Sequence, residues 1–248
     1  MRKFFIYILF LAMTATMCGC QQDSGDTPDL ESNGYYLWII AYEDIRHVGD
    51  IFDFLARYKY MQDIEDATQR EEYGRRFLDK GIINVDGSIH TITYDTGYDT
   101  NYHITIEPTD NGWHISRSGG DGYALDIIDS PTGAMVANFE YLYHNESSGK
   151  GNFNASVSYN ESGTPTLYFT GKLELVDYEG DRDKPLTVTT NITEVTTYTT
   201  AAGIIEGEME ITAYDALYDS TDTATATILK STRQVVIESM GTNTVYRL

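Results

Sequence analysis

Residues 204–214, IIEGEMEITAY, decide the fold class of this chain. Apolar and polar side chains alternate along this stretch, as they do in a β-strand that has one buried face and one solvated face. The odd-numbered positions are mainly apolar, with Ile205, Met209, Ile211 and Ala213. The even-numbered positions are mainly polar, with Glu206, Glu208, Glu210 and Thr212. A strand that buries one face only is typical of an antiparallel sheet, which we therefore expect.

The same period of two continues on both sides of this stretch, from residue 82 to the C-terminus. No intervening segment has the length and period of a crossover helix, so the strands should follow one another as an antiparallel meander. Beyond 204–214, strands are expected near 135–144, 152–160, 166–178, 186–199, 223–230, 233–239 and 243–247. Turns are expected at Gly149–Gly151, Gly180–Pro185, Ala201–Gly203 and Gly241–Asn243.

Two pairs of residues, Asp86-Gly87 and Asn111-Gly112, have the composition of tight hairpin turns. If Asn111 and Gly112 form a two-residue loop, Asp110 opposes Trp113 and the numbers of paired residues sum to 223. A register that separates apolar from polar residues is strongly favoured, because a slip of one residue exchanges the two faces. The apolar face then contains Ile104, Ile106, Pro108, Trp113 and Ile115.

One expected strand is irregular. Within residues 186–199 the apolar parity slips between Ile192 and Val195. An extra residue in one strand of an antiparallel pair produces such a slip, so we expect a β-bulge here.

Residues 35–80 have a helical period instead of a strand period. Apolar residues at spacings of three and four are Leu37, Ala41, Ile45, Val48, Phe52, Leu55 and Tyr58, followed by Ile64, Ala67, Phe77 and Leu78. The opposite side of the first helix contains Glu43, Asp50, Asp53 and Arg57, and Gly81 is the expected C-cap of the second. We therefore expect one mainly β domain over 34–248: an antiparallel meander forming a sandwich or a partly open barrel, with an N-terminal helical pair packed at one end.

The residues before this domain have a different character. Arg2 and Lys3 precede an apolar run, residues 4–13, that is too short to cross a bilayer core of about 30 Å. A basic start and a short apolar run are typical of a signal peptide, expected here over residues 1–19. This segment is followed by the thiol of Cys20, and the sequence around the junction is Met17-Cys18-Gly19-Cys20, with the small residue Gly19 directly before Cys20.

This ending resembles the lipobox of bacterial lipoproteins, although Met17 stands where that family usually has Leu. The resemblance implies cleavage after Gly19 and attachment of diacylglycerol to Cys20, with fatty acyl chains such as palmitate anchoring the protein to a membrane. Cys18 is a rival acceptor. The alternative interpretation is a secreted protein that is cleaved nearby and keeps a spare thiol.

Residues 20–33 are polar, acidic and rich in turn formers, so we expect a flexible lipidated tether that reaches roughly 43 Å when extended. Its second residue, Gln21, is not the aspartate that retains many lipoproteins in the inner membrane. Asp23 and Asp26 resemble the acidic export tether of Bacteroidota cell-surface lipoproteins. This resemblance implies an outer-membrane location, with the body on the cell surface or on the periplasmic face.

Charge and cysteine content exclude several classes of function. The formal charge is −21, and loss of Arg2 and Lys3 makes it more negative. Such a surface repels phosphate, so no nucleic-acid partner is expected. Cys18 and Cys20 are the only cysteines of the chain. If Cys18 is removed and Cys20 is acylated, no thiol remains for a disulfide, a nucleophile or a metal site.

Catalytic motifs give little support to an enzyme. Asp95-Thr96-Gly97 matches the DTG of aspartic proteases, but the second loop, Asp23-Ser24-Gly25, lies in the tether, and a simple turn is the alternative. Glu206, Glu208 and Glu210 share a face at about 6.6 Å spacing, which suits paired carboxylates or a water-facing strand. His103 and His114 lie about 20 Å apart in the expected register, too far to share a zinc ion.

Two loops are candidates for a calcium site. Asp177, Glu179, Asp181 and Asp183 place oxygen ligands at alternate positions around Gly180. Asp121 and Asp126 partly match a calcium-binding nonapeptide repeat, of which the chain has a single copy. An ordinary solvated loop is the alternative for both.

Surface residues suggest modification and recognition. Asp219-Ser220-Thr221 and Asp222-Thr223-Ala224 resemble the O-glycosylation acceptor motif of Bacteroidota, which implies modification of Ser220 or Thr223 in an expected loop. Trp113, expected at a hairpin tip among many tyrosines, could stack on a sugar. We therefore expect a membrane-anchored extracytoplasmic lipoprotein that binds a glycan, a protein or a small ligand without catalysis. A carboxylate-based hydrolase of glycan or peptide, and a structural component of an envelope or fimbria-like assembly, remain alternatives.

Overall fold

The structure is a computed structural model. It describes residues 30–78, 81–94, 102–118, 122–129, 135–142, 147–177 and 184–247. Two helices come first, α2 (Leu30–Asp63) and α3 (Ala67–Phe77). The strands that follow are β1 (Ile82–Asp86), β2 (Ile89–Tyr94), β3 (Tyr102–Thr109), β4 (Gly112–Ser118), β5 (Gly122–Asp129), β6 (Met135–Leu142), β7 (Ser147–Tyr159), β8 (Pro165–Asp177), β9 (Leu186–Thr199), β10 (Gly203–Asp215), β11 (Ser220–Leu229), β12 (Gln234–Ser239) and β13 (Thr242–Arg247).

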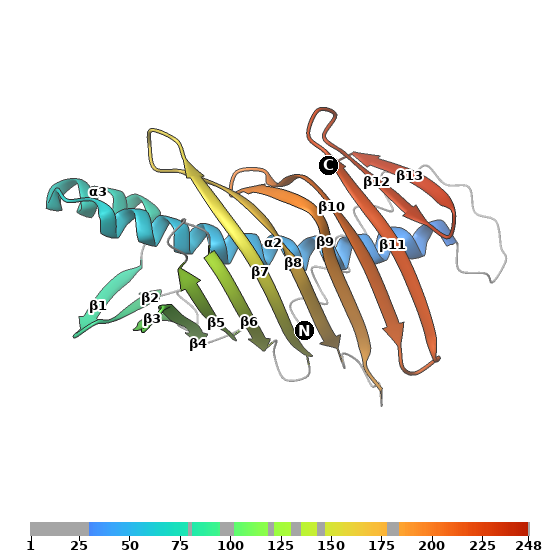
Figure 1. The fold of residues 1–248 in the computed structure, drawn as a ribbon, viewed down its shortest axis with the longest axis horizontal. Coiled ribbons are helices and arrows are strands. Elements are labelled where there is room, and N and C mark those ends of the chain that lie inside the picture. Colours follow the sequence, from blue (N-terminus) through green and yellow to red (C-terminus); the bar gives the residue numbers. More distant parts are fainter. Residues whose placement is uncertain are drawn as a thin grey trace.

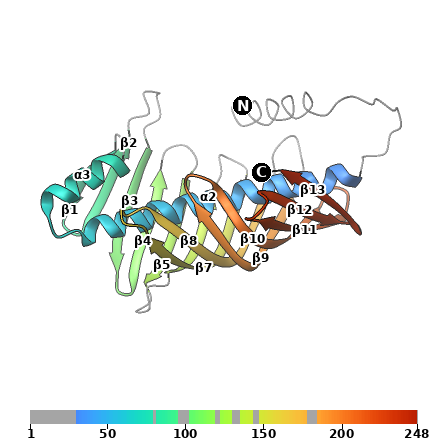
Figure 2. The same ribbon diagram turned by 90° about the horizontal axis from the view of Figure 1, so that it is seen from above.

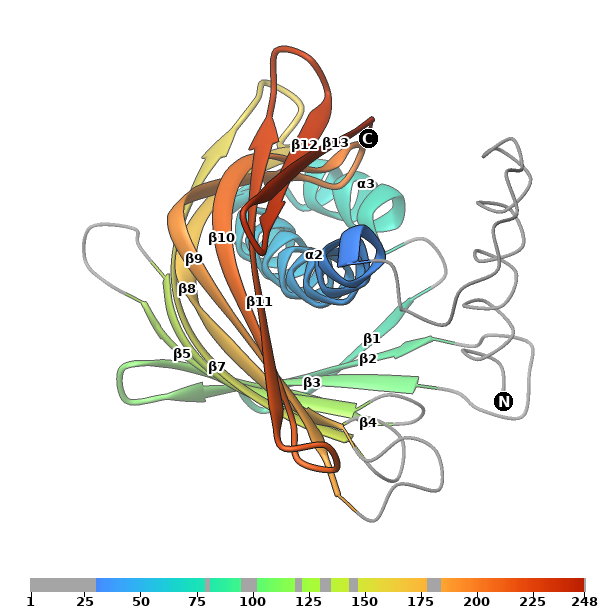
Figure 3. The same ribbon diagram turned by 90° about the vertical axis from the view of Figure 1, so that its right-hand side faces the viewer.

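All the strands form one antiparallel sheet in which each pairs with its neighbours in sequence, from β1 at one edge to β13 at the other. Figure 3 shows that the sheet curls around α2 and stays open on one side. The expected fold class, a mainly β antiparallel meander with an N-terminal helical pair, is confirmed.

The position of the first helix differs from the expectation of two helices at one end. Helix α2 runs across the concave face of the sheet and contacts strands β8 to β12 (Figure 1). Only α3 lies at an end, the same end of the molecule as β1 and β2 (Figure 2). The periodicity of α2 indicated an apolar stripe, but it could not indicate that a curved sheet would wrap around the helix.

Helix α2 supplies the centre of the hydrophobic core. The helix is 34 residues long, and several side chains along it are fully buried: Ala41, Ile45, Phe52 and Ala56. The ring of Phe52 packs against two sheet residues, with its centroid 6.1 Å from that of Phe153 and 5.9 Å from that of Phe169. A helix that is buried around most of its circumference behaves as a core element rather than as a surface helix.

Two glycines permit close approach between the helices and the sheet. A Cβ atom on Gly49 of α2 would lie 2.6 Å from the ring of Tyr198 on β9. Gly163, in the turn between β7 and β8, has φ +76°, and a Cβ atom there would lie 2.4 Å from the ring of Tyr60. Gly49 is unfavourable in a helix interior, so its presence in α2 is explained by packing.

The two tight hairpins, β1–β2 and β3–β4, have registers that differ from the expected ones. β3 and β4 pair with Thr109 opposite Gly112 and Pro108 opposite Trp113, a sum of 221 rather than 223. The loop is therefore Asp110-Asn111, and the shift by two residues leaves each side chain on its expected face. The β1–β2 loop is Gly87-Ser88, because Asp86 still pairs with Ile89.

Three other local expectations can be compared with the structure. Gly149–Gly151 form part of β7 rather than a turn, since Gly149 and Gly151 pair with Leu175 and Leu173 of β8. Gly81 donates its N–H to the carbonyl of Leu78, whereas the cap of α3 is Leu78 itself. The expected bulge in β9 is confirmed: the β8–β9 pairing shifts between Phe169/Thr196 and Gly171/Ile192.

Candidate functional site

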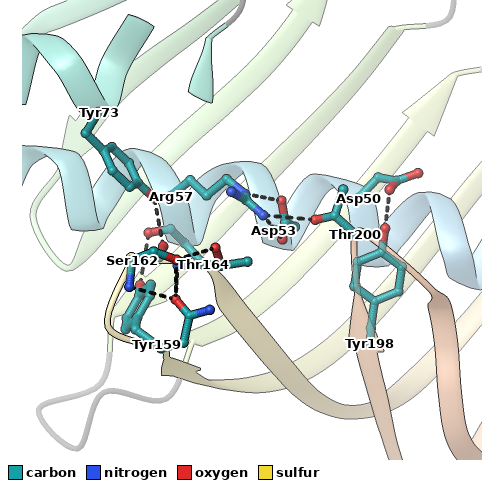
Figure 4. Close-up of polar contacts among 12 residues, drawn as sticks. Asp50, Asp53, Arg57, Tyr73, Tyr159, Ser162, Thr164, Tyr198 and Thr200 are labelled. Carbon is teal, nitrogen blue, oxygen red and sulfur yellow. Dashed lines mark hydrogen bonds and ion pairs between the residues drawn. The ribbon is translucent and has the colours of Figure 1, made fainter. Parts of the chain in front are cut away.

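Polar side chains gather where the polar side of α2 meets the hairpin turns β7–β8 and β9–β10 (Figure 4). We call this region the helix–hairpin seam. It contains Asp50, Asp53 and Arg57 of α2, Tyr73 of α3, Tyr159 of β7, Gly163 in the β7–β8 turn, Tyr198 of β9 and Thr200 in the β9–β10 turn. The acidic and basic residues fall on one side of α2 because they recur at helical spacings.

Asp53 and Arg57 form the most buried ion pair of the seam. Arg57 Nε lies 2.6 Å from Asp53 Oδ2, and Arg57 Nη2 lies 3.3 Å from Oδ1. The side chains are 7% and 19% exposed for Asp53 and Arg57 respectively. Arg57 also donates to Thr200 Oγ1 at 3.2 Å, so this pair links α2 to the β9–β10 turn. The hydrogen bond to Thr200, donated by an arginine that Asp53 orients, favours one position of the helix against this turn.

Tyr198 makes the second link between α2 and β9. Its hydroxyl donates to Asp50 Oδ1. Burial, followed by the hydrogen bond to Asp50, raises the pKa of Tyr198 far above its ordinary value. The phenol therefore stays protonated, and it acts as a hydrogen-bond donor rather than as a base.

Two more tyrosines close the seam on the side of β7. Tyr73 donates to the carbonyl oxygen of Gly163 at 2.8 Å, and Tyr159 donates to that of Ala56 at 2.9 Å. Burial raises the pKa of Tyr159 to about 12, and it raises that of Tyr73 as well. Asn160 Oδ1 orders the adjacent turn, because it accepts hydrogen bonds from the backbone N–H groups of Ser162 and Thr164.

This geometry holds the helix in the sheet. The carboxylates of Asp50 and Asp53 both have partners, and the three phenols donate to fixed acceptors. Sequence reasoning placed Asp50, Asp53 and Arg57 on one side of the helix but missed their contacts. Helical spacing was the available signal, whereas the partners on β9 and in the hairpin turns are more than 100 residues away in the chain.

The glutamates of β10 lie on the outer face of the sheet. Glu206 and Glu210 are exposed, and Asn191 Nδ2 lies 3.5 Å from Glu210 Oε2. Glu208 is half-buried and accepts from Thr193 Oγ1 at 3.0 Å and from Thr227 Oγ1 at 3.3 Å. These contacts match the water-facing strand interpretation.

The histidines named above are separated in the structure as well. His103 contacts Thr93 Oγ1 through Nδ1 at 3.1 Å, whereas His114 Nδ1 lies 2.8 Å from Asp126 Oδ1. Asp126 belongs to strand β5. Among the described residues, no group of three or more His, Cys, Asp or Glu side chains could hold a metal ion.

Trp113 and the two glycosylation candidates occupy strands rather than loops. Trp113 is the second residue of β4 and is half-buried against the core, with Lys59 Nζ 5.9 Å from the centre of its ring. Ser220 and Thr223 lie in β11, and both are exposed. A hydroxyl on this strand remains accessible, whereas Trp113 does not stand at a free tip.

Several predicted residues lie outside the described part of the chain. These are Cys20, the Asp95-Thr96-Gly97 motif, Asp121, and Glu179, Asp181 and Asp183; Asp177 ends β8, but its side chain is not described. No described helix is both long enough and apolar enough to cross a membrane.

Comparison with known proteins gives no relative. No protein-family model, no curated protein and no solved structure matches the chain.

Proposed function

We propose that this chain is a lipid-anchored protein of the bacterial outer membrane that binds a glycan or a protein on the outside of its sheet, without catalysis. The location is supported by the resemblance of Met17-Cys18-Gly19-Cys20 to a lipobox and by the acidic tether that follows. The mode of binding is supported by one observation above all: α2 occupies the concave face of the sheet.

A curled sheet can in principle hold a small ligand on its inner face. Here the inner side chains of the central strands pack against α2, and Phe52, Phe153 and Phe169 meet with almost no exposure. A ligand would therefore contact the outer face, the hairpin turns or the free edges. The outer face offers hydrogen-bonding groups, such as Asn154 on β7, Thr189 on β9 and Thr225 on β11.

A structural role in an envelope assembly is the second candidate, because one observation favours it. The first and last strands, β1 and β13, each pair with one neighbour among the described residues. Unpaired strand edges are the usual means by which sheets add a further strand.

The first experiment tests anchoring and orientation together. Producing cells are labelled with an alkyne-bearing fatty acid, treated with external protease, and blotted for residues 35–248. We expect label on the parent chain, no label on Cys20→Ala, and loss of the body while a periplasmic control survives. Label that persists on Cys20→Ala would overturn the anchor, and full protection of the body would overturn surface exposure.

Binding is tested separately on the purified protein. The protein is applied to an array of neutral and acidic polysaccharides and to envelope protein fractions. We expect saturable binding to at least one of them, and we expect that binding to survive the replacement of core-facing residues by similar apolar residues. Binding that instead competes with a small apolar dye for the interior would contradict the proposed location.

A further inference from the structure

Strand β1 is an edge with unusual side chains. Its sequence is Ile82-Ile83-Asn84-Val85-Asp86, and it pairs with β2 on one side. Ile82 is 64% exposed and Val85 is 61% exposed. These two residues lie on opposite faces of the sheet, because their positions differ in parity. The edge therefore exposes apolar side chains above and below a backbone that, among the described residues, pairs with β2 alone.

Natural proteins commonly protect such edges with Lys, Pro or an inward-pointing charge. Strand β1 contains neither Lys nor Pro, and its one charged residue, Asp86, is the last of the strand. Figure 1 shows β1 at one end of the sheet, where a further strand would lengthen the sheet.

The pattern of β1 is complementary to itself. If two copies of the strand pair antiparallel about a two-fold axis at Asn84, Ile83 lies opposite Val85 of the second copy. The reciprocal pair is identical, as a two-fold axis requires. Ile83 and Val85 share a face with Ile92 and His90, their partners on β2. Four apolar side chains would thus continue the inner face of the sheet across the axis.

The charges agree with the same register. Asp86 would lie opposite Ile82 of the second copy, and the two Asp86 residues would stand about 14 Å apart along the strand. That separation exceeds the Debye length at physiological salt, about 8 Å, so their repulsion is screened. A register centred elsewhere would place one Asp86 nearer the other or move Val85 away from its apolar partner.

We propose that β1 pairs with β1 of a second copy of this chain, joining two sheets edge to edge. A strand of five residues gives a small interface, so association should be weak in dilute solution and should rise with protein concentration. The proposal rests on the described edge alone, and it holds whether or not Cys20 carries a lipid.

Cysteine crosslinking at the axis tests this pairing. Asn84→Cys is introduced into the full chain, and producing cells with their medium are treated with a short bis-maleimide. The parent chain shows any crosslink that arises from Cys18 or Cys20. Asn154→Cys, on the exposed outer face of central strand β7, measures random collision, and Asn243→Cys tests the other edge, β13.

We expect the dimer yield of Asn84→Cys to exceed that of Asn154→Cys and Asn243→Cys by at least ten-fold. Adding Val85→Lys should abolish this excess, because it places an ammonium against Ile83 of the second copy. Adding Leu217→Lys, at an exposed residue beyond β10, should leave the yield unchanged. Equal yields at 84 and 154, a higher yield at 243, or a yield that resists Val85→Lys would each overturn the proposal.

Discussion

Replacement of Phe52 by Ala should lower the stability of the whole domain. Phe52 is fully buried in the middle of α2, and its ring contacts Phe153 of β7 and Phe169 of β8. The substitution removes the ring and leaves a cavity between the helix and two central strands. If α2 is the centre of the core, the sheet and the helix should both become less stable.

The magnitude follows from burial. Burying a Phe side chain contributes about 1.5–3 kcal/mol through transfer from water, and a cavity that cannot collapse adds to this loss. Two aromatic contacts are also lost. We expect a decrease of about 4 kcal/mol in the free energy of unfolding, which for a domain of this size lowers the Tm by roughly 8–16 °C.

Equilibrium urea unfolding, followed by circular dichroism, measures this change. The matched control is Tyr218→Ala, since Tyr218 is 74% exposed and should change stability by less than about 0.5 kcal/mol. A loss below about 1 kcal/mol for Phe52→Ala would refute the reasoning, because it would mean that the helix and the sheet are not packed together through this residue.

Three further predictions concern the ion pair of the helix–hairpin seam, two glycines in turns, and a buried tyrosine of α2. Asp53→Ala should cost about 3 kcal/mol in urea unfolding, because it leaves Arg57 partly buried without its carboxylate, and the double variant with Arg57→Leu should recover part of that loss. Gly163→Ala should lower the free energy of unfolding by about 2–4 kcal/mol, because the added Cβ would meet the ring of Tyr60. Gly87→Ala has a similar positive φ but no atom near the added Cβ, so it should cost about 1 kcal/mol. Equal costs would disprove the role assigned to contact with Tyr60. Burial raises the pKa of Tyr58 to about 12, above the value near 10 in the unfolded chain. The protonated phenol therefore contributes fully to the free energy of unfolding below pH 10, and this contribution is lost as the pH rises from about 10 to 12. The decline in stability over that range should be shallower in Tyr58→Phe, and identical slopes would contradict the assignment.

Much of the sheet could be predicted from the sequence, because its strands bury one face. Alternation located β8 to β13 within about three residues at each end, and the slip between Ile192 and Val195 indicated the bulge in β9. The β3–β4 register was wrong by a shift of two residues, which parity cannot detect. Gly149–Gly151 were misread as a turn because glycine is tolerated inside this strand, where Gly151 packs beside Phe153.

The relation of helix to sheet could not be predicted in the same way. Periodicity describes one face of an element, but the curvature of a long sheet depends on twist accumulated over many strands. The contacts of Asp50 with Tyr198 and of Arg57 with Thr200 connect residues that only this curvature brings together. Asp53 illustrates the limit: its polar side chain suggested a solvated face, yet that side chain is only 7% exposed.

Hydrogen exchange of α2 tests the central claim most directly, because the proposed location of binding depends on this helix staying within the sheet. The amides of residues 37–61 should exchange as slowly as those of β8 to β10, through global unfolding of the domain. Exchange of α2 that is orders of magnitude faster than that of these strands would contradict the account. It would mean that the helix leaves the concave face while the sheet remains folded.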